Sequence, residues 1–503
     1  METAPPHSMA KEVQRPKGYS LAHWIFQGKI QAPHVEDQEV VFTSMSPFGV
    51  EEEEAWWTGF ELIRVADNKL VEIDKVLKAQ KKIPLLASRV KGANNATELS
   101  RLIEVKNWKP LDATLKVTDV ASLVQRLGGE ALYGSRKDYA LRELIQNARD
   151  AVVARRLIDD HGVEFGKITV GVTTENGRSF FSVSDNGVGM SHEVLTKFLL
   201  DFGRSYWRDM QAVIDHPGLG KKGFRSVGKF GIGFFSVFML GKEVSVTTRR
   251  SQDGKADTTI LTFQNGVIGR TTIRKANPHE QLREPGTIVK IAMESAVQNV
   301  ASFLGPLQHG GPLLGRFTKQ KDWSLADLCE WIAPCLDVDL VVSEDRHERK
   351  VVSADDWKNM ESSLLLRRLM LEHDDIEEIC AHPKYMAMCK TIDTLSDAEG
   401  NVFGRATLCH FAENSLVLGL NRATSFPCVV TVGGFRTTSP LPIVGVLIGE
   451  STVATRNDAI PAVFDNMEFL SDWATNQAKA FEIQNDQSSL NRAGLVRKCG
   501  GFT

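Results

Sequence analysis

One predicted helix constrains this chain more than any other stretch. In "RELIQNARDA", residues 142–151, apolar positions such as Leu144 share one face at helical spacing, and Glu143, Asn147 and Asp150 cluster on another. A polar stripe of this kind is most often a solvated surface. A solvated stripe usually gains from oppositely charged neighbours, however, whereas Glu143 faces an amide and a second carboxylate. That combination indicates a site that receives a cation or a water molecule.

Strand patterns follow this helix, which we expect over residues 138–157. "KITVGVTT" and "SFFSVSD" alternate apolar and polar residues and flank Asn176-Gly177, a strong signal for a two-residue hairpin turn. "EVSVTTRR", "DTTILTF" and "GTIVKIAM" continue the pattern around a loop-rich segment over residues 190–230. The predicted fold class is therefore α+β, with long helices packed on one face of a mostly antiparallel sheet.

Three short patches around these strands are candidates for ligand contacts. Asp185 in "SDNGVGM" stands at a strand end beside glycines that let a ligand approach the backbone. "GKFGIGFFSVF" carries Gly228, Gly231 and Gly233 into a helix start, where free backbone N–H groups suit phosphate. Thr287 in "EPGTIVKI" begins a strand. Each patch alone is also explained as an ordinary turn, and only their order along the chain makes them informative together.

That order is a helix with Glu and Asn, a strand ending in Asp-x-Gly-x-Gly, a Gly-x-x-Gly-x-Gly loop that opens a helix, and Gly-Thr on a strand. It resembles the GHKL superfamily of ATPases, and "RELIQNARDA", "DNGVGM" and "GKFGIGFFSVFML" are most similar to the ninety-kilodalton heat shock protein family. The resemblance implies a GHKL (Bergerat) α/β sandwich that binds ATP over residues 115–296. It further implies a middle-like α/β domain over residues 297–503.

The resemblance also implies roles for single residues. Glu143 is then the general base that activates water, and Asn147 is the ligand of Mg²⁺. Asp185, with Thr287 beside it, accepts a hydrogen bond from the adenine amino group, and residues 191–227 form a mobile lid over bound ATP. The remaining cofactor contacts that the resemblance implies are Asp150, Gly187, Gly189, Met190, Gly228, Phe230, Gly231, Gly233 and Phe234.

Two positions depart from the family, and one assignment stays open. Ala154 stands where the family usually has a lysine, with Arg155 next to it, and the lid begins with "LLDFGRS" where the chaperones tend to show paired asparagines. "VGVLIGESTVATRNDAI" resembles the chaperone segment that sends an arginine to the terminal phosphate, which makes Arg456 the candidate catalytic arginine. Pairing of Arg456 with Asp458 is an equal alternative, and Arg436 in "GGFRTT" is a second candidate.

Composition bounds the partners and the compartment. A net charge of −3 over 503 residues gives no reason to expect attraction to nucleic acid or to an anionic membrane. Seven cysteines without a Cys-x-x-Cys pair argue against a disulfide framework and a zinc site. The first residues lack the apolar core of a signal peptide, so we expect a flexible tail over residues 1–17 and a cytoplasmic location. Residues 18–114 are predicted as an N-terminal extension of mixed or helical structure.

The predicted function is Mg²⁺-dependent ATP hydrolysis that drives lid closure and domain rearrangement, in a chaperone-like protein acting on protein clients or partners. Because fewer than 50 residues follow Arg456, we do not expect the C-terminal dimer of the chaperones, and ATP-dependent self-association stays open. One alternative is an ATP-gated clamp on DNA, which requires a basic groove. The other is a non-hydrolysing nucleotide sensor in a stress or defence system.

Overall fold

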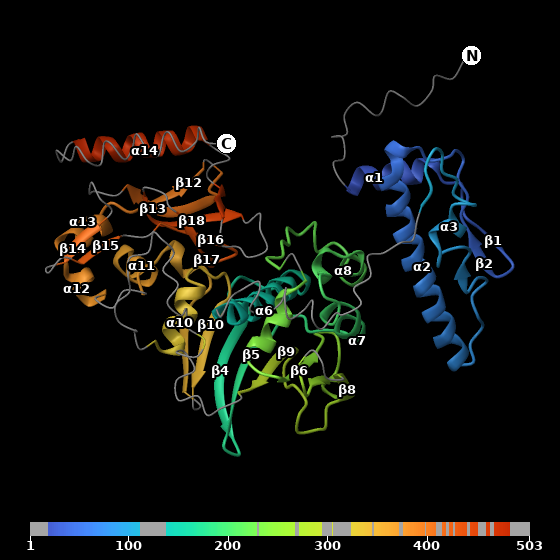
Figure 1. Cartoon of the computed structure of the whole chain (residues 1–503), viewed down its shortest axis with the longest axis horizontal. Helices are drawn as coiled ribbons and strands as arrows, with labels where there is room; N and C mark the ends of the chain where they lie inside the picture. The colour runs from blue at the N-terminus through green and yellow to red at the C-terminus, as the bar shows by residue number, and fades with distance from the viewer. Residues whose placement is uncertain are drawn as a thin grey trace, which may run out of the picture. The chain divides into compact units, whose positions relative to one another are not determined.

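The chain forms two compact units, residues 1–118 and 119–503, which are considered separately (Figure 1). The computed structural model describes residues 19–110, 137–228, 231–266, 271–293, 304, 323–344, 347–371, 376–397, 399–408, 415–418, 422–425, 428–439, 443–450, 459–462 and 467–482. None of the helices in these ranges has the length and apolar character needed to cross a membrane.

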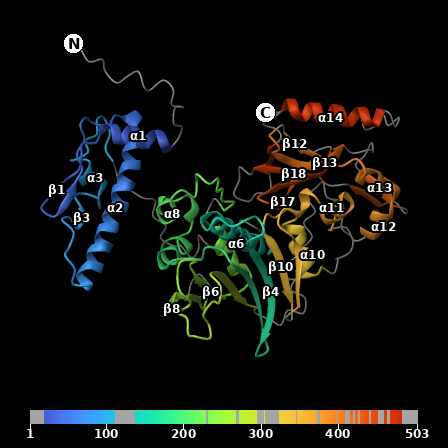
Figure 2. The ribbon, with the colours of Figure 1, turned by 180° about the vertical axis from the view of Figure 1, so that it is seen from behind.

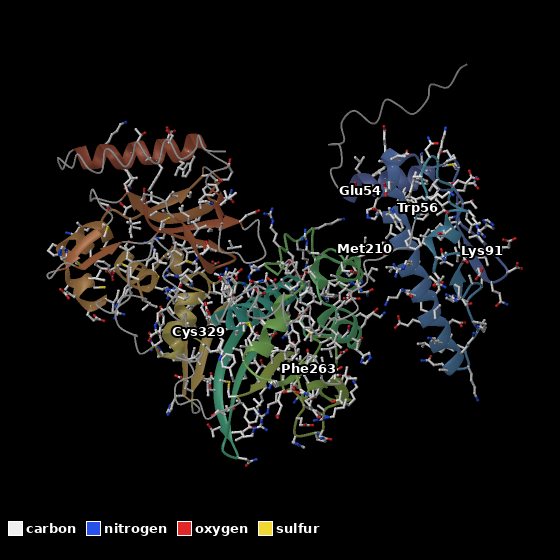
Figure 3. All side chains as sticks on the ribbon, viewed as in Figure 1. Glu54, Trp56, Lys91, Met210, Phe263 and Cys329 are labelled. Atoms are coloured by element: carbon white, nitrogen blue, oxygen red, sulfur yellow. The ribbon has the colours of Figure 1, made fainter. Side chains whose placement is uncertain are left out.

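The first unit has its own aromatic core. Trp56 of helix α2 (Glu53–Ala79) stacks on Phe60 with ring centroids 5.7 Å apart, and its indole N–H donates to the carbonyl of Ile103 at 3.0 Å (Figure 3). Gly59 lets the ring of Phe26 approach the helix backbone. The other elements of the unit are α1 (Tyr19–Lys29), β1 (His34–Glu36), β2 (Glu39–Val41), a 3₁₀ turn (Val50–Glu52), β3 (Arg89–Val90) and α3 (Ala96–Leu99).

Helix α6 (Asp138–Ile158) is the central element of the second unit. Its apolar side, which includes Leu141, Leu144 and Ile145, packs in the core against the sheet. Two of the three residues on its polar side are buried as well, because Glu143 is only 6% exposed and Asp150 only 1% exposed, whereas Asn147 is exposed. Glu143 and Asp150 are therefore not part of a solvated stripe and need partners inside the protein.

The hairpin predicted at Asn176-Gly177 is confirmed. Asn176 has φ 50° and Gly177 has φ 78°, and both values are typical of the tight turn that connects twisted antiparallel strands. β4 (Lys167–Glu175) and β5 (Arg178–Asp185) pair through it, with Val170 opposite Val183. The antiparallel neighbours that follow across the sheet are β9 (Gly286–Ala292), β6 (Glu243–Arg249), β7 (Thr259–Phe263) and β8 (Thr271–Lys275).

The sheet continues on the other side of β4 with strands from beyond residue 296, where we expected a new domain to begin. β10 (Asp339–Glu344) pairs with β4 in parallel, and β11 (His347–Val352) pairs with β10. The eight-stranded order is β11-β10-β4-β5-β9-β6-β7-β8. α10 (Leu325–Ile332) precedes β10 and begins with a capping box between Ser324 and Asp327. The α+β class with a mostly antiparallel sheet is confirmed.

A second sheet contains β12 (Asp393–Ser396), β13 (Val402–Leu408), β18 (Ile443–Glu450), β16 (Cys428–Val432) and β17 (Phe435–Ser439), and β19 (Ile460–Pro461) pairs with β18. Alternate residues of its strands pack on opposite layers: Val429 contacts the α11 side, and Val430 contacts the α14 side (Figure 2). The helices of this region are α11 (Ser362–Leu369), α12 (Ile376–Ala381), α13 (Pro383–Cys389) and α14 (Met467–Glu482), beside a separate hairpin of β14 (Ser415–Leu418) and β15 (Arg422–Ser425).

Buried arginines of helix α6 contact residues that come much later in the chain, Asp337 and Arg436. The guanidinium of Arg149 donates through Nε to the carboxylate of Asp337 at 2.8 Å and through NH1 to Asp150 at 2.9 Å. Arg142 donates to the carbonyl of Arg436 in β17 at 2.9 Å. Burial lowers the pKa of Arg149, but the two adjacent carboxylates outweigh it and raise that pKa above its ordinary value.

We predict that Asp337→Ala lowers the free energy of unfolding by roughly 3 kcal/mol, because the buried guanidinium of Arg149 loses one of its two carboxylates. Chemical denaturation of the full chain measures the change. The matched control is Glu348→Ala, which removes an exposed ion pair with Lys167 on the same sheet and should cost less than about 1 kcal/mol. Equal losses in both variants would contradict this account of Arg149.

Candidate functional site

A cavity of about 180 Å³ lies between helix α6, the first sheet and the segment over residues 191–207. Most residues predicted for the site line it, and they come from four separate segments of the chain. These are Glu143, Asn147, Asp185, Gly189, Met190, Gly228, Gly231, Gly233, Phe234 and Thr287. Asp150 and Gly187 are not among the lining residues, and Phe230 and Arg456 lie outside the described residues.

Asp185 and Thr287 meet at the end of the cavity that lies over the sheet. They face each other in the pairing of β5 with β9, and Oδ1 of Asp185 accepts a hydrogen bond from the amide of Gly187 at 2.8 Å. Burial raises the pKa of the Asp185 carboxyl to about 7, although hydrogen bonds from Gly187 and Thr287 oppose the shift. A carboxylate in a mostly apolar cavity is a selective acceptor for an N–H donor.

The sequence analysis did not identify Thr248, which supports this end of the cavity. Its fully buried hydroxyl lies 3.0 Å from that of Thr287, donates to the carbonyl of Gly286 and accepts from the amide of Met190 at 2.9 Å. The available signal was the alternation of β6, in which Thr248 occupies the same inward face as Val246.

The glycines beside Asp185 are required by close contacts. A Cβ on Gly189 would lie 2.0 Å from the carbonyl oxygen of Arg249, and the φ of Gly189 is 68°. A Cβ on Gly187 would lie 2.6 Å from the carbonyl carbon of Ala151 in helix α6. Both positions therefore need glycine for packing between strand and helix, and Gly187 contributes to the site through its amide on Asp185.

Glu143 and Asn147 lie at the other end, beside the glycine-rich loop. The Glu143 carboxylate fills the space next to Gly233, since a Cβ there would lie 2.0 Å from Oε2. The short helix expected after the glycines is a 3₁₀ helix (Gly233–Met239). Backbone N–H groups near a helix start, together with a carboxylate and an amide, suit a phosphate and its metal ion.

Asp150 lies behind this loop and supports it. Its carboxylate accepts hydrogen bonds from the amides of Val227 at 3.0 Å and Gly228 at 2.8 Å, and from Arg149. Burial raises the pKa of Asp150, and Arg149 and the two amides partly offset this shift. Asp150 thus contacts the backbone of the loop and does not line the cavity.

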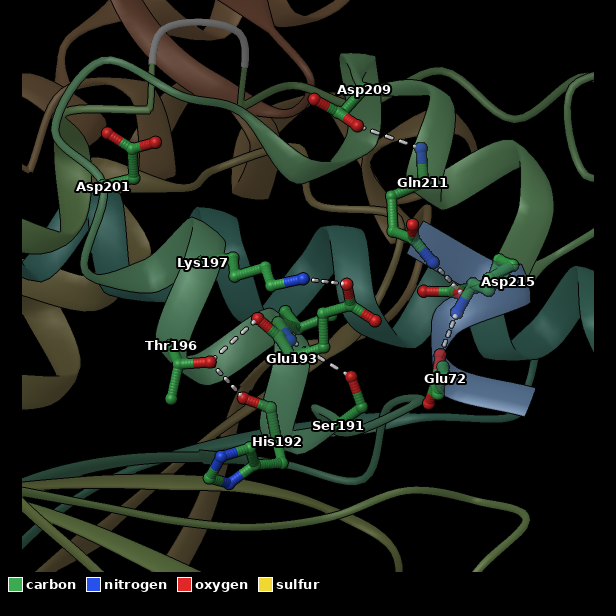
Figure 4. Close-up of polar contacts among 12 residues, drawn as sticks. Glu72, Ser191, His192, Glu193, Thr196, Lys197, Asp201, Asp209, Gln211 and Asp215 are labelled. Carbon is green, nitrogen blue, oxygen red and sulfur yellow. Dashed lines mark hydrogen bonds and ion pairs between the residues drawn. The ribbon is translucent and has the colours of Figure 1, made fainter. Parts of the chain in front are cut away.

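Residues 191–207 cover the cavity. They include α7 (His192–Val194), a π-helix (Leu195–Leu199) and most of a 3₁₀ turn (Tyr206–Arg208), and α8 (Met210–Asp215) follows. Local polar contacts order this segment, such as Lys197 with Glu193 at 2.7 Å and Gln211 with Asp215 at 2.7 Å (Figure 4). The lining side chains that it supplies, which the sequence analysis did not single out, are Val194, Phe198, Leu199, Arg204, Ser205, Tyr206 and Trp207.

Two of the arginines considered in the sequence analysis make other contacts. Arg155, next to Ala154, donates to the carbonyl of Asn186 at 2.7 Å. Arg436 donates to the carbonyls of Trp331 and Leu369 at 3.1 and 2.7 Å. Neither arginine lines the cavity.

The residues present suit Mg²⁺ only in company with a phosphate. Asn147 supplies one amide oxygen and Glu143 one carboxylate at the loop end of the cavity. Within the described part of the chain, no three His, Cys, Asp or Glu residues form a metal-binding group. Mg²⁺ typically keeps several water ligands and binds through one or two protein oxygens and substrate phosphates, which this donor set matches.

Known proteins match the same part of the chain. Residues 135–285 match the family model described as "Histidine kinase-, DNA gyrase B-, and HSP90-like ATPase". The Chaperone protein HtpG of Shewanella denitrificans is 35% identical over 136 residues, which cover 26% of this chain and 21% of HtpG. HtpG of Azorhizobium caulinodans is 34% identical over 159 residues, which cover 28% of this chain and 24% of that protein.

HtpG of Rhizobium meliloti is 36% identical over 146 residues, which cover 27% of this chain and 22% of HtpG. The matched region thus spans less than a quarter of the length of these three curated relatives. It contains helix α6, Asp185 and the glycine-rich loop. Residues 135–285 therefore belong to the GHKL superfamily of ATPase domains and are similar to part of the HtpG chaperones.

Proposed function

We propose that this chain binds ATP in the cavity beside helix α6 and hydrolyses it with the help of Mg²⁺. The observation that carries the proposal is that one cavity holds a half-buried carboxylate acceptor at one end and a carboxylate, an amide and a glycine-rich loop at the other. The acceptor suits an adenine amino group, the carboxylate and the amide suit an attacking water and a metal ion, and the glycine-rich loop suits a phosphate chain.

Each residue has a defined task in this proposal. Asp185 accepts the adenine amino N–H, and Thr248 and Thr287 hold the strand ends around it. Asn147 holds Mg²⁺, which neutralises phosphate charge when bound. Glu143 takes a proton from the water that attacks the terminal phosphorus, the bond to the bridging oxygen breaks, and ADP and inorganic phosphate leave.

Chaperone-like action on protein clients or partners is the wider proposal. It is supported by the match to HtpG chaperones over the nucleotide domain. Lid closure would act on the second sheet through Val227, which precedes Gly228 and touches Gly433 at the turn between β16 and β17. ATP-dependent self-association and a cytoplasmic location belong to the same proposal.

A non-hydrolysing sensor is the second candidate function. The observation that favours it is that no arginine of the described middle-like region lines the cavity, and that Arg436 is occupied by two backbone carbonyls. Hydrolysis by this chain would then depend on an arginine such as Arg456 or on a partner protein. An ATP-gated clamp on DNA has no comparable observation in its favour.

We predict that Glu143→Ala keeps ATP affinity within a fewfold of wild type and loses ATP turnover by about a hundredfold or more, because only the proton acceptor is removed. Phosphate release with and without Mg²⁺ measures turnover, and calorimetry measures affinity. Glu175→Ala, which removes an exposed carboxylate paired with Lys290 at the far end of β4, is the matched control. Binding without turnover in the wild type would favour the sensor instead.

We predict that adenine recognition weakens as the pH falls through about 7, because the raised pKa of Asp185 means that its carboxylate gains a proton there. Affinity should decline by roughly tenfold per pH unit below that value and level off above it. Adenosine is the probe, since it lacks the phosphates that also titrate near neutral pH. Asp185→Asn should bind weakly and without this pH dependence, and a flat wild-type profile would contradict the assignment of Asp185.

A further inference from the structure

Arg155 lies on helix α6 one turn beyond Ala151, which lines the cavity, and it contacts the turn that carries Asp185. Its NH1 group donates to the backbone carbonyl of Asn186 at 2.7 Å. Asn186 stands between Asp185, the proposed adenine acceptor, and Gly187. Arg155 itself does not line the cavity. Its influence on a bound ligand would therefore be indirect, through this turn.

Two further contacts fix the Arg155 guanidinium. Its Nε donates to the carboxylate of Asp159, one turn later in the chain, at 3.2 Å. Its Cζ lies 5.0 Å from the ring centroid of Phe165, and that ring stacks on His161 at 3.9 Å. A planar guanidinium can donate in two directions and cover an aromatic ring at once, which a lysine ammonium cannot do. The donor that meets Asn186 is therefore held in place before any ligand binds.

One peptide group connects Arg155 to Asp185. The carbonyl of Asn186 and the amide N–H of Gly187 belong to the same planar unit, in which oxygen and hydrogen point in opposite directions. Arg155 binds the oxygen of this unit, and its N–H donates to Oδ1 of Asp185 at 2.8 Å. A rotation of the peptide plane would disturb both bonds together. Arg155 thus fixes the orientation of the N–H group that holds the Asp185 carboxylate.

The charge of Arg155 acts in the same direction as this contact. Burial raises the pKa of the Asp185 carboxyl, and the amides of Gly187 and Thr287 and then the charge of Arg155 oppose that effect. A cationic donor on a carbonyl oxygen also polarises its peptide group, so that the N–H at the other end becomes a stronger donor. Both effects favour the ionised carboxylate, which is the form that accepts a hydrogen bond.

We propose that Arg155 is a positioning residue for adenine recognition, and that it aims the Asp185 carboxylate at the amino group of the base through the peptide between Asn186 and Gly187. This inference rests on the proposed function. Without Arg155 the glycine-rich loop, Glu143 and the rest of the cavity remain, so nucleotides still bind. The preference for a base that carries an amino group is what declines.

The test is calorimetric titration of the full chain with ADP and with inosine diphosphate, in the presence of Mg²⁺. Inosine carries an oxygen where adenosine carries the amino group, so the wild type should prefer ADP by about tenfold or more. Arg155→Met removes every donor and keeps a long unbranched side chain. It should weaken ADP binding by roughly tenfold and inosine diphosphate binding little, so that the preference falls towards one.

Two further variants sharpen this test. Arg155→Lys retains one cationic donor and should keep an intermediate preference for ADP. Arg178→Met is the matched control, because Arg178 is an exposed arginine at the opposite end of β5, where it pairs with Glu243 at 3.0 Å. It should change neither affinity. The preference is a ratio measured on one sample, so a misfolded fraction lowers the number of binding sites and leaves the ratio as it is.

Equal losses for ADP and inosine diphosphate in Arg155→Met would mean that Arg155 only supports the cavity as a whole. Unchanged affinities would mean that it does not position Asp185. Either result overturns the inference while the proposed function stands. A wild type that binds both nucleotides equally would show that Asp185 does not read the amino group, and the inference would fail although nucleotide binding stands. If the wild type binds neither nucleotide, the proposed function fails, and the inference fails with it.

Discussion

The structure of the second unit depends on a guanidinium buried between two carboxylates. Arg149 contacts Asp150 within helix α6 and Asp337 just before β10. The buried charge of Arg149 is stable because these two carboxylates neutralise it. Asp150 in turn receives the amides that open the glycine-rich loop. One charged cluster therefore sets the position of the helix, the start of the loop and the strand that extends the sheet beyond β4.

This arrangement explains how helix α6 buries charged residues as well as its apolar face, with Asn147 left exposed at the cavity. Its apolar face packs on β4 and β5, its cavity side presents Glu143 and Asn147, and its remaining side carries arginines with carboxylate or carbonyl partners. A polar helix face in the interior is stable only when each charge is paired. Because the pairing partners belong to residues 337–436, the nucleotide domain and the following residues form one packed unit.

The nucleotide site and the second sheet thus share a short physical connection. Val227 comes just before the glycine-rich loop, lies in the common core and touches the turn at Gly433. A change in the position of the loop would be transmitted to the turn between β16 and β17 through this contact, and to Asp337 before β10 through Asp150 and Arg149. That contact supports the proposal that ATP binding alters the second sheet. The part of the HtpG relatives that matches this chain does not include that sheet, so experiment has to identify its partner.

Local patterns along residues 138–291 were enough to predict the helix, the hairpin at Asn176-Gly177 and the α+β class. These features depend on hydrophobic period and turn chemistry, which are written in neighbouring residues. The four segments that meet at the cavity were indicated by the family resemblance that the order of their motifs carries. The parallel pairing of β10 with β4, the hydroxyl contacts of Thr248 and the position of Asp150 behind the loop were decided only by tertiary structure. Each of them rests on a contact between residues far apart in the chain, and no local pattern specifies which distant partner a buried charge or hydroxyl will find.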